Sequence, residues 1–373
     1  MSKIISFVFN DFTNDLRVLK ENISLKNAGF KMTVVATLES GLKKLEFVKD
    51  LEVHRIKVNY IKALPIQLFF YWIKCIVKYR KEAIFHCNDL YALPIGVFIK
   101  IFFNKKAKVV YDCHEYETEA HIYDGRKWLK IAAKISERLL IRYCDEVITV
   151  SESIANEYQR LYKIKKPTLV LNCPRFQKYE KKDLFRQKFG IKPETKIVLF
   201  QGEYRKGRGL EIMIEAFKKL NDKNLALVFL GYGALTNFVK QETMSSSNIY
   251  VHETVSLDVY MDYICSADFG IHIMENTCLN HYYALPNKLF EYIMAGLPVI
   301  VSNLYEMKRF VEKYNVGIVL HENNVASLLE VLNKINSLDL TIVRENTQKV
   351  AQVYNWGNQE ITLINLYKNL VQK

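Results

Sequence analysis

Short apolar runs alternate with longer amphipathic segments along the first 150 residues. Residues 14–28 predict a helix that ends near Gly29, and other helical segments separate the apolar runs. Strands separated by helices favour right-handed crossovers, and therefore a parallel sheet covered by helices. Five runs predict buried strands: IISFVF (4–9), KMTVVAT (31–37), AIFHC (83–87), KVVYDC (108–113) and EVITVS (146–151).

The same pattern then starts again. Predicted helices at 209–220, 257–265 and 286–295 alternate with six predicted strands, at 196–202, 225–231, 248–253, 267–273, 297–302 and 316–320. The repeated pattern predicts an α/β protein with two tandem Rossmann-like, doubly wound domains that face a cleft.

The boundary between the domains is expected near VLNCPRF (170–176), where Pro174 interrupts a strand-like run. This gives an N-terminal domain of residues 1–174 and a C-terminal domain of residues 175–354. The last helix, within 355–373, could pack on either domain.

Ligands of doubly wound sheets bind outside the carboxyl ends of the strands. The segments that follow predicted strands are therefore the candidate site loops. They are residues 10–15, 86–91, 112–118, 202–209, 231–235 and 274–287.

The segment PNKLFEYIMAG combines a helix start with two charged residues on one face. With Pro286 at the first helical position, the N–H groups of residues 287–289 lack partners in their own helix and form an anion site. Lys288 would add positive charge there, and Glu291 could accept hydrogen bonds from a diol such as a ribose. Taken alone, the two residues are more simply explained as an i, i+3 ion pair on a surface helix.

Composition supports a globular protein of two ordinary domains. Of its 373 residues, 50% are hydrophobic and 25% are charged. Its seven cysteines are scattered without any CxxC pair, which indicates buried thiols in a reducing compartment rather than a zinc site. The start, MSKIISFVFNDF, lacks the pattern of a signal peptide and predicts the first strand of a cytoplasmic protein.

The net charge of +13 suggests an anionic partner. No nucleic-acid motif is visible, so we do not expect a nucleic-acid partner. Residues 61–83 form an aromatic-rich amphipathic segment with a basic face, which predicts contact with an anionic membrane surface. A packed surface helix is the alternative, and no apolar run approaches the ~20 residues needed to span a bilayer.

Several motifs, in order along nearly the whole chain, together resemble the family 4 glycosyltransferases, which have the GT-B fold. YYALPNKLFEYIMAGLPVIVSN resembles the nucleotide-sugar signature of that family. FQGEYRKGRGLEIMIEAF and VFLGYGAL resemble the start of its donor domain. The remaining matches are NDFTNDLRVLKENISLKNAGFKMTVVA, VVYDCHEYETE, DEVITVSESIANEY, VLNCP and ADFGIHI.

The resemblance implies roles for the second domain. Glu291 would hold the nucleotide ribose, and the backbone of Asn287, Lys288 and Leu289 would face the diphosphate. Lys206 matches one of two cations that grip the diphosphate in the family. Glu203 stands where many relatives have the other, so the charge is expected from Arg208 or, as a second choice, Arg205.

Three glycines of the second domain also match, and one position departs from the family. Gly202 lies in the loop that carries the diphosphate cations. Gly231 and Gly233 resemble a loop near the nucleotide base, although a plain tight turn explains them equally well. Tyr283 stands where relatives have the first of two glutamates, and Glu275 cannot be assumed to replace it.

In the first domain, the resemblance places His114 near the transferred sugar. The acceptor side would be formed by Asn10, Asp11, His86, Asp89 and Glu115. The 10–15 loop lacks the glycine pair of many relatives. A histidine at the end of a strand is more often a structural hydrogen-bonding group, and for His86 that explanation is favoured.

The resemblance thus implies a retaining hexosyltransferase. It would move a sugar from a nucleotide-sugar donor, most simply a UDP-sugar, to a lipid-linked or glycan acceptor in cell-surface polysaccharide synthesis. It would use no metal or cofactor and lie peripherally on the inner face of the plasma membrane. The alternatives are a nucleotide-sugar 2-epimerase of the same fold and a non-catalytic nucleotide-sugar-binding protein.

Overall fold

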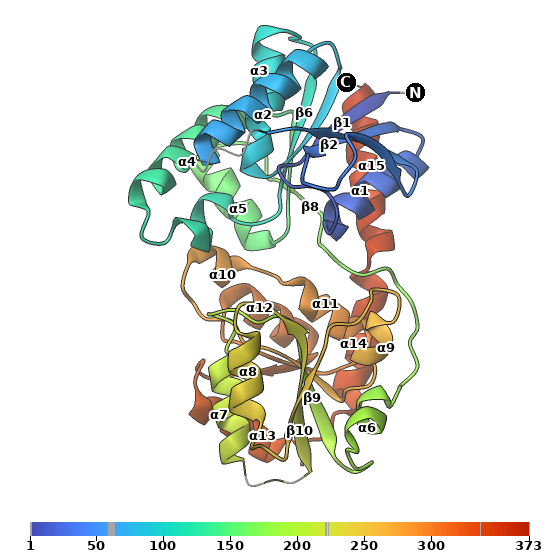
Figure 1. Cartoon of the computed structure of the whole chain (residues 1–373), viewed down its shortest axis with the longest axis vertical. Coiled ribbons are helices and arrows are strands. Elements are labelled where there is room, and N and C mark those ends of the chain that lie inside the picture. The colour runs from blue at the N-terminus through green and yellow to red at the C-terminus, as the bar shows by residue number, and fades with distance from the viewer. Residues whose placement is uncertain (1, 59–63, 221, 223, 336, 373) are drawn as a thin grey trace. The chain divides into compact units, whose positions relative to one another are not determined.

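The computed structural model describes residues 2–58, 64–220, 222, 224–335 and 337–372. The chain forms two compact units (Figure 1). Unit 1 contains Met1–Asn172 and Asn358–Lys373, and unit 2 contains Cys173–Gly357. Each is an α/β unit built around a mainly parallel sheet, as predicted. None of the helices in the described ranges has the length and apolarity needed to cross a membrane.

The sheet of unit 1 has the strand order β3-β4-β2-β1-β5-β6-β7-β8 within the described residues. Every pair is parallel except β3 with β4. The bounds are β1 Lys3–Phe7, β2 Lys31–Thr37, β3 Leu45–Val48, β4 Leu51–Ile56, β5 Ile84–Asn88, β6 Lys108–Cys113, β7 Glu146–Thr149 and β8 Thr168–Leu169.

The five predicted strands of unit 1 are present, but the β3–β4 hairpin was not predicted. Its two strands are short, and its turn is formed by Lys49 and Asp50 at positive φ (47° and 60°). Such turns usually contain Asn-Gly or Asp-Gly, so Lys-Asp gave no recognisable turn signal.

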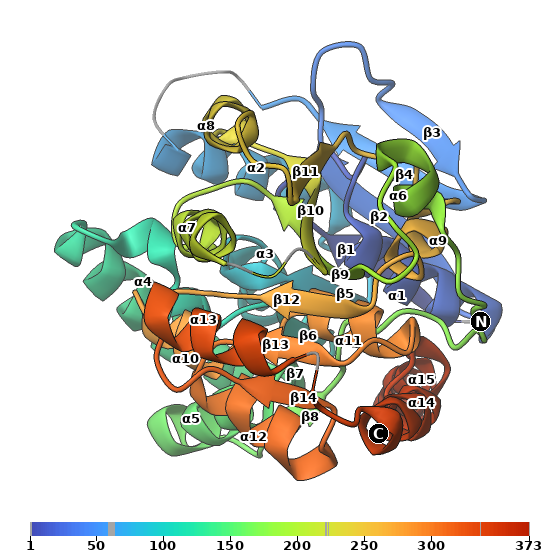
Figure 2. The same ribbon diagram turned by 90° about the horizontal axis from the view of Figure 1, so that it is seen from below.

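Helices cover both faces of this sheet. Figure 2 shows α1 and α15 on one side and α2 and α3 on the other. α1 begins where the Asp15 side chain accepts from the Val18 N–H, and it ends before Gly29, at positive φ (96°). The helices are α1 Leu16–Asn27, α2 Leu64–Tyr79, α3 Asp89–Phe102, α4 Lys127–Leu140, α5 Glu152–Tyr162 and α15 Trp356–Gln372, with 3₁₀ turns η1 Glu117–Glu119, η2 His121–Tyr123 and η3 Ile141–Tyr143.

The sheet of unit 2 has the order β11-β10-β9-β12-β13-β14 among the described residues, and its pairs are parallel. Its strands are β9 Lys196–Glu203, β10 Leu225–Tyr232, β11 Ile249–His252, β12 Phe269–His272, β13 Val299–Val301 and β14 Gly317–Val319. Its helices are α6 Leu184–Phe189, α7 Leu210–Lys219, α8 Thr236–Thr243, α9 Tyr260–Ile264, α10 Leu279–Tyr283, α11 Asn287–Met294, α12 Tyr305–Tyr314, α13 Val325–Lys334 and α14 Thr341–Val353.

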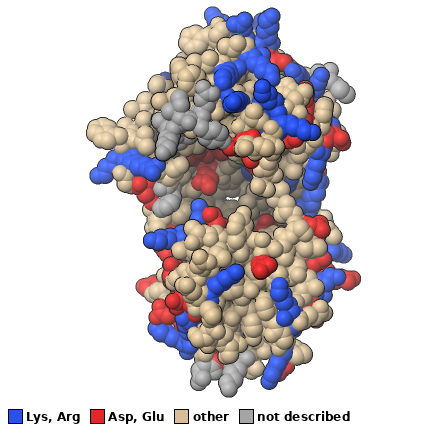
Figure 3. All heavy atoms as spheres, in the orientation of Figure 1, with Lys and Arg blue, Asp and Glu red and all other residues tan. Residues whose placement is uncertain are grey.

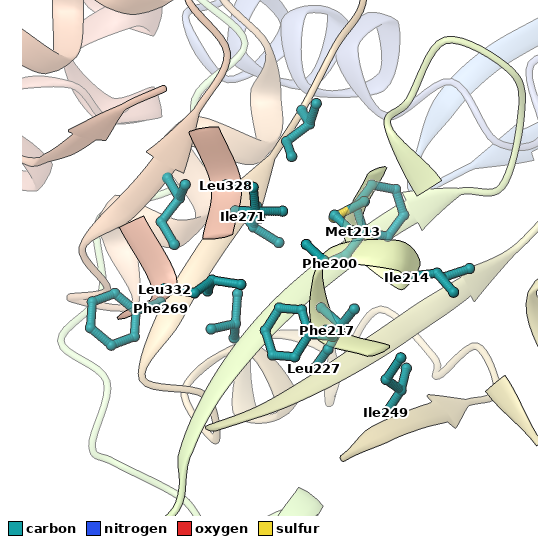
Figure 4. Close-up of a cluster of buried hydrophobic side chains, with 14 of the residues drawn as sticks. Phe200, Met213, Ile214, Phe217, Leu227, Ile249, Phe269, Ile271, Leu328 and Leu332 are labelled. Atoms are coloured by element: carbon teal, nitrogen blue, oxygen red, sulfur yellow. The ribbon is translucent and has the colours of Figure 1, made fainter. Parts of the chain in front are cut away.

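The two faces of the β9–β12 region are closely packed. On one face, α7 and α13 bury Met213, Phe217, Leu328 and Leu332 against the sheet (Figure 4). On the other, the ring of Tyr292 lies so close to Gly270 that a Cβ there would be 2.2 Å from the ring. α11 is therefore fixed directly against β12, which determines where its first turn points.

Candidate active site

The loops of unit 2 that were predicted to carry the site meet where β9 and β12 lie side by side. The chain leaves β9 toward α7 and leaves β12 toward α10 and α11 on the opposite face, so this is a topological switch point. The Glu275 N–H donates to the carbonyl of Gly207 at 3.0 Å and ties the two loops together.

The helix α11 begins and ends where the sequence predicted, with one correction. Pro286 is the residue before the helix, not its first residue, and the Leu289 N–H donates to the Pro286 carbonyl at 3.1 Å. Leu289 is therefore not a free donor. The N–H groups of Asn287 and Lys288, at the helix start, have no carbonyl available within their own helix. They form the positive end of the helix dipole.

Lys288 lies across Gly202 at the end of β9. A Cβ on Gly202 would be 2.2 Å from the Cε of Lys288, and the φ of Gly202 is +123°, so only glycine fits this position. Burial, together with the nearby charges of Arg208 and Arg205, lowers the pKa of Lys288, while Glu291 acts in the opposite direction. Three cations thus converge beside the first turn of α11, as a diphosphate would require.

The other predicted residues of the β9 loop differ in placement. Arg208 is half-buried, and its Nη1 lies 3.5 Å from the sulfur of Met274. Arg205 is exposed and lies 3.5 Å from the carboxylate of Glu203. Lys206 is exposed at the tip of the loop. Arg208 is therefore held in place by the protein, whereas Lys206 extends into solvent.

Glu291 is oriented by two residues that the sequence did not point to. Its Oε2 accepts hydrogen bonds from Nε2 of Gln201 at 2.8 Å and from the hydroxyl of Tyr260 at 3.1 Å. Burial and the charge of Glu291 raise the pKa of Tyr260 well above its ordinary value, so its hydroxyl remains a donor. Since both bonds fall on Oε2, the arrangement suits a carboxylate that offers Oε1 to a ligand.

His272, at the end of β12, was also missed. Its side chain is buried, and neither ring nitrogen has a hydrogen-bond partner among the described residues. Burial lowers its pKa well below the usual value, and the charges of Lys288, Arg208 and His281 lower it further. A neutral imidazole thus lies next to the cations of the site.

Gly231 and Gly233 are explained by packing. A Cβ on Gly231 would be 1.9 Å from the carbonyl oxygen of Gly202, and one on Gly233 would be 2.5 Å from that of Tyr204. They permit the close approach of β10 to β9. Tyr283 stands where relatives have the first of two glutamates. Its ring centroid lies 6.1 Å from that of Tyr305.

In unit 1, His114 follows β6 and is held between two carboxylates. Its Nδ1 lies 3.3 Å from Asp89, and its Nε2 lies 3.3 Å from Asp112. Burial lowers the pKa of His114, but Asp89 and Asp112 more than reverse this, and the pKa lies well above its usual value. His114 is thus an imidazolium at neutral pH. It can donate hydrogen bonds or stabilise negative charge, but it cannot act as a general base.

His86 is not on a loop, as was expected, but in the buried interior of β5. Its Nδ1 lies 2.5 Å from the hydroxyl of Tyr367, and its Nε2 lies 3.1 Å from Oδ1 of Asn88. Burial lowers its pKa, but hydrogen bonds to Asp112 and Glu21 raise it to about 9. With both ring nitrogens occupied and the side chain 1% exposed, His86 is a structural residue and does not orient an acceptor.

The sequence also gave no sign of the ion network around His86. Ligand atoms of Glu21, His86 and Asp112 lie within 4.8 Å of one another, a spacing that could hold a metal ion. The Arg17 guanidinium instead lies 3.0 Å from Glu21 and 2.9 Å from Asp112. Its charge, with that of protonated His86, already neutralises the carboxylates, so the cluster fits a buried salt-bridge network better than a metal site.

The remaining acceptor-side residues lie at the ends of strands in unit 1. Asn10 and Asp11 accept from the backbone N–H groups of Phe12 and Thr13 and so shape the turn after β1. Asp89 starts α3, and Glu115 is exposed beside His114.

Most of the predicted amphipathic segment 61–83 forms the helix α2, Leu64–Tyr79. Residues 59–63 lie outside the described residues. Trp72 is half-buried and donates to the carbonyl of Tyr91, and Leu68 is buried. Figure 3 shows Lys and Arg side chains gathered over the part of unit 1 where α2 and α3 lie. The outward apolar residues of α2 are Ile66, Phe69, Phe70, Ile73 and Val77.

Comparison of the sequence with known families gives two matches that together span most of the chain. Residues 23–174 match Glycosyltransferase Family 4, and residues 181–352 match Glycosyl transferases group 1. An uncharacterized glycosyltransferase of Methanocaldococcus jannaschii is 25% identical over 240 residues. This match covers 60% of the present chain and 60% of that relative.

Solved structures resemble the chain over its whole length. Sucrose-phosphate synthase from Thermosynechococcus elongatus has a TM-score of 0.82 and 15% identity, with all of both chains covered. HepE from Anabaena, solved in complex with UDP-glucose, has a TM-score of 0.75 and 14% identity, again over all of both chains. At such identities the similarity concerns the fold.

Proposed function

Because this chain belongs to the family 4 glycosyltransferases and has their GT-B fold, we propose that it transfers a hexose from a UDP-sugar, with retention of configuration. The acceptor is a lipid-linked or glycan hydroxyl in the synthesis of a cell-surface polysaccharide.

The observation that carries the proposal is the arrangement around the first turn of α11. Lys288, Arg208 and Arg205 supply positive charge beside the free amides of the helix start, and Glu291 is held by two hydrogen bonds a turn farther on. A nucleoside diphosphate presents matching groups, an anionic diphosphate and a ribose diol. The choice of uridine is supported by HepE, a structure of the same fold that was solved with UDP-glucose.

Transfer breaks the bond between the anomeric carbon and the diphosphate oxygen, so negative charge develops on the departing UDP. In this proposal Lys288, Arg208 and the amides of Asn287 and Lys288 stabilise that charge, and no metal is needed. Lys206 adds charge from the end of its exposed loop. For His114 of unit 1, the proposed role is that of an imidazolium that acts on the transferred sugar, as the resemblance to the family implies.

We further propose that the protein works in a reducing compartment, peripherally on the inner face of the plasma membrane. All seven cysteines are free thiols, which suits that compartment. The exposed apolar residues of α2 and the lysines beside them support contact of residues 61–83 with an anionic membrane.

Glu291→Ala tests the donor site. Loss of the carboxylate removes charged hydrogen bonds, and we expect the Kd for UDP to rise about tenfold or more in isothermal titration calorimetry. Glu211→Ala, at an exposed glutamate of α7, is the matched control and should bind UDP as the unaltered protein does. An unchanged Kd for Glu291→Ala would show that the ribose is held elsewhere.

The reaction class is tested by product analysis. With donor and acceptor together, the new glycosidic bond should keep the anomeric configuration of the donor, measured by NMR. Conversion of the donor into its 2-epimer without acceptor would identify an epimerase, and UDP binding with neither reaction would identify a binding protein.

A further inference from the structure

The helix α4 in unit 1 exposes apolar side chains and buries a charged one, the reverse of what contact with water alone would favour. Its residue Glu137 is fully buried, while several of its apolar side chains face solvent. Trp128, Ile131, Ile135 and Leu139 are spaced three or four residues apart and form one stripe, which we call the α4 stripe. At about 100° per residue, Glu137 lies on the side of the helix opposite this stripe.

The buried face of α4 is fixed by a polar anchor. The hydroxyls of Tyr111 and Tyr158 donate to Oε1 of Glu137 at 2.8 Å each, and the hydroxyl of Tyr162 donates to its Oε2. Burial raises the pKa of Glu137, and these hydrogen bonds act against that rise. Turning the stripe inward would place the carboxylate in solvent and leave the Tyr111 and Tyr158 hydroxyls buried without it, so the outward direction of the stripe is built into the core.

The exposure of the α4 stripe is large. Trp128 is 83% exposed, Ile131 47%, Ile135 55% and Leu139 54%. Trp128 is also the most exposed of the three tryptophans, since Trp72 is half-buried and Trp356 is fully buried. A contiguous apolar stripe of this size usually marks an interaction surface.

Cations follow one edge of the stripe. Lys127, Lys134 and Arg138 lie seven and four residues apart, on one side of α4, and are exposed. Arg126 and Arg142 are exposed just before and just after the helix. The buried carboxylate of Glu119 is engaged by Lys130 and Lys134. Asp124, in the turn before α4, is an exposed acidic residue nearby. The edge therefore carries excess positive charge.

We propose that α4 lies in the headgroup region of an anionic bilayer, with the α4 stripe inserted among the acyl chains and its cations against lipid phosphates. Apolar side chains flanked by Lys and Arg, with a tryptophan at one end, suit the interface of an anionic membrane. A second copy of the chain suits it less well, because antiparallel two-fold packing of α4 on α4 would bring the same cations face to face. The proposal rests on the proposed function, because membrane contact through α4 would bring unit 1 to a lipid-linked acceptor. The α4 stripe is separate from the apolar residues of α2.

Vesicle binding tests the α4 stripe. We expect the triple variant Trp128→Ser, Ile135→Ser, Leu139→Ser to lose at least tenfold in sedimentation with vesicles of phosphatidylglycerol and phosphatidylcholine. Unaltered protein should show a blue shift of tryptophan emission on these vesicles, and Trp128→Leu should remove the shift while preserving sedimentation. Charge reversal at Lys127 and Arg138 should weaken binding mainly at low salt.

A second variant, Phe69→Ser, Ile73→Ser, Val77→Ser on α2, tests the other proposed membrane segment independently. Helical content and the Kd for UDP should be unchanged in both triple variants, so a failure of the donor site and a failure of this surface can be told apart. Undiminished vesicle binding by the folded α4 variant would overturn the proposal. So would light scattering that shows a dimer for the unaltered protein and a monomer for the α4 variant.

Discussion

At the scale of single residues, the site of unit 2 depends on the absence of a side chain at Gly202. The side chain of Lys288 crosses the space that a Cβ would occupy, 2.2 Å from its Cε. The glycine therefore does not serve flexibility. It lets a cation lie flat against the end of β9, next to the start of α11.

Gly202→Ala is expected to displace Lys288 and to raise the Kd for UDP about tenfold, measured by calorimetry. The matched control is Gly190→Ala, which also has positive φ (+65°) but no atom within 4 Å of the added Cβ. It should cost about 1 kcal/mol of stability from backbone strain and leave UDP binding unchanged. Equal affinity in the two variants would mean that the position of Lys288 does not matter for the donor.

His86 makes the stability of unit 1 depend on pH. The folded-state pKa, about 9, lies above the ordinary value near ~6.5, so protonation of His86 stabilises the folded state. That contribution is complete below pH ~6.5 and is lost as the pH rises through about 9. The free energy of unfolding should therefore fall by about 3 kcal/mol between pH 6 and pH 9.5, measured with urea.

His86→Gln should be less stable at pH 6 and should show a flatter dependence over the same range. His321→Gln, at an exposed histidine, serves as the control and should keep the slope of the unaltered protein. An identical slope in His86→Gln would mean that other groups of the network carry the pH dependence.

Among the site residues, the sequence identified those with local signals and missed those that act across the fold. Lys288 lies two residues after the proline that precedes a helix, and Arg208 lies in a glycine-rich loop after a strand. Gln201, Tyr260 and His272 have no such context. Their importance arises because β9, α9 and β12 meet around α11, which only the three-dimensional arrangement reveals.

At the scale of elements, the same limit separates α2 from α4. Helical periodicity tells which residues share a face, but not which face is turned outward. For α2 the sequence predicted an amphipathic segment, and the structure places Leu68 and Trp72 of that segment against the unit. For α4, the direction of the helix is set by Glu137 and tyrosines from β6 and α5, a contact that no local pattern announces.

The strands show the same distinction. Long apolar runs such as β2 and β10 were predicted because burial on both faces leaves a continuous signal. The hairpin of β3 and β4 at the edge of the sheet was missed, since both strands are short and their turn lacks glycine. The fold class depends on the central strands and was therefore predictable, and the edge was not.

At the scale of the whole molecule, the last helix belongs mainly to the first unit. The expected boundary lay at 174/175, and the two units divide at 172/173 and again at 357/358. From Asn358 onward, α15 packs in unit 1, where Ser24 donates to Glu360 and the Leu171 N–H donates to Gln359. The sequence predicted this helix but left its domain open. In the structure Tyr367 is buried in unit 1, where its hydroxyl lies 2.5 Å from Nδ1 of His86.

A chain that stops after Gly357 should separate the two units functionally. It loses Leu363, Leu366, Tyr367 and Leu370, all buried in unit 1, and leaves the pKa-shifted His86 without its hydroxyl partner. Loss of four core side chains should cost as much as the free energy of unfolding of a typical domain, ~5–15 kcal/mol, so unit 1 should not remain folded. Unit 2 retains α11, Gln201 and Tyr260, so UDP should still bind, as measured by titration calorimetry. The unfolding transition of unit 1 should disappear from scanning calorimetry, and sugar transfer should be lost.

The control is a chain that stops after Leu370, which lacks only the end of the helix and should keep both transitions. If the shorter chain retained the unit 1 transition, α15 would be an addition to that unit rather than part of its core.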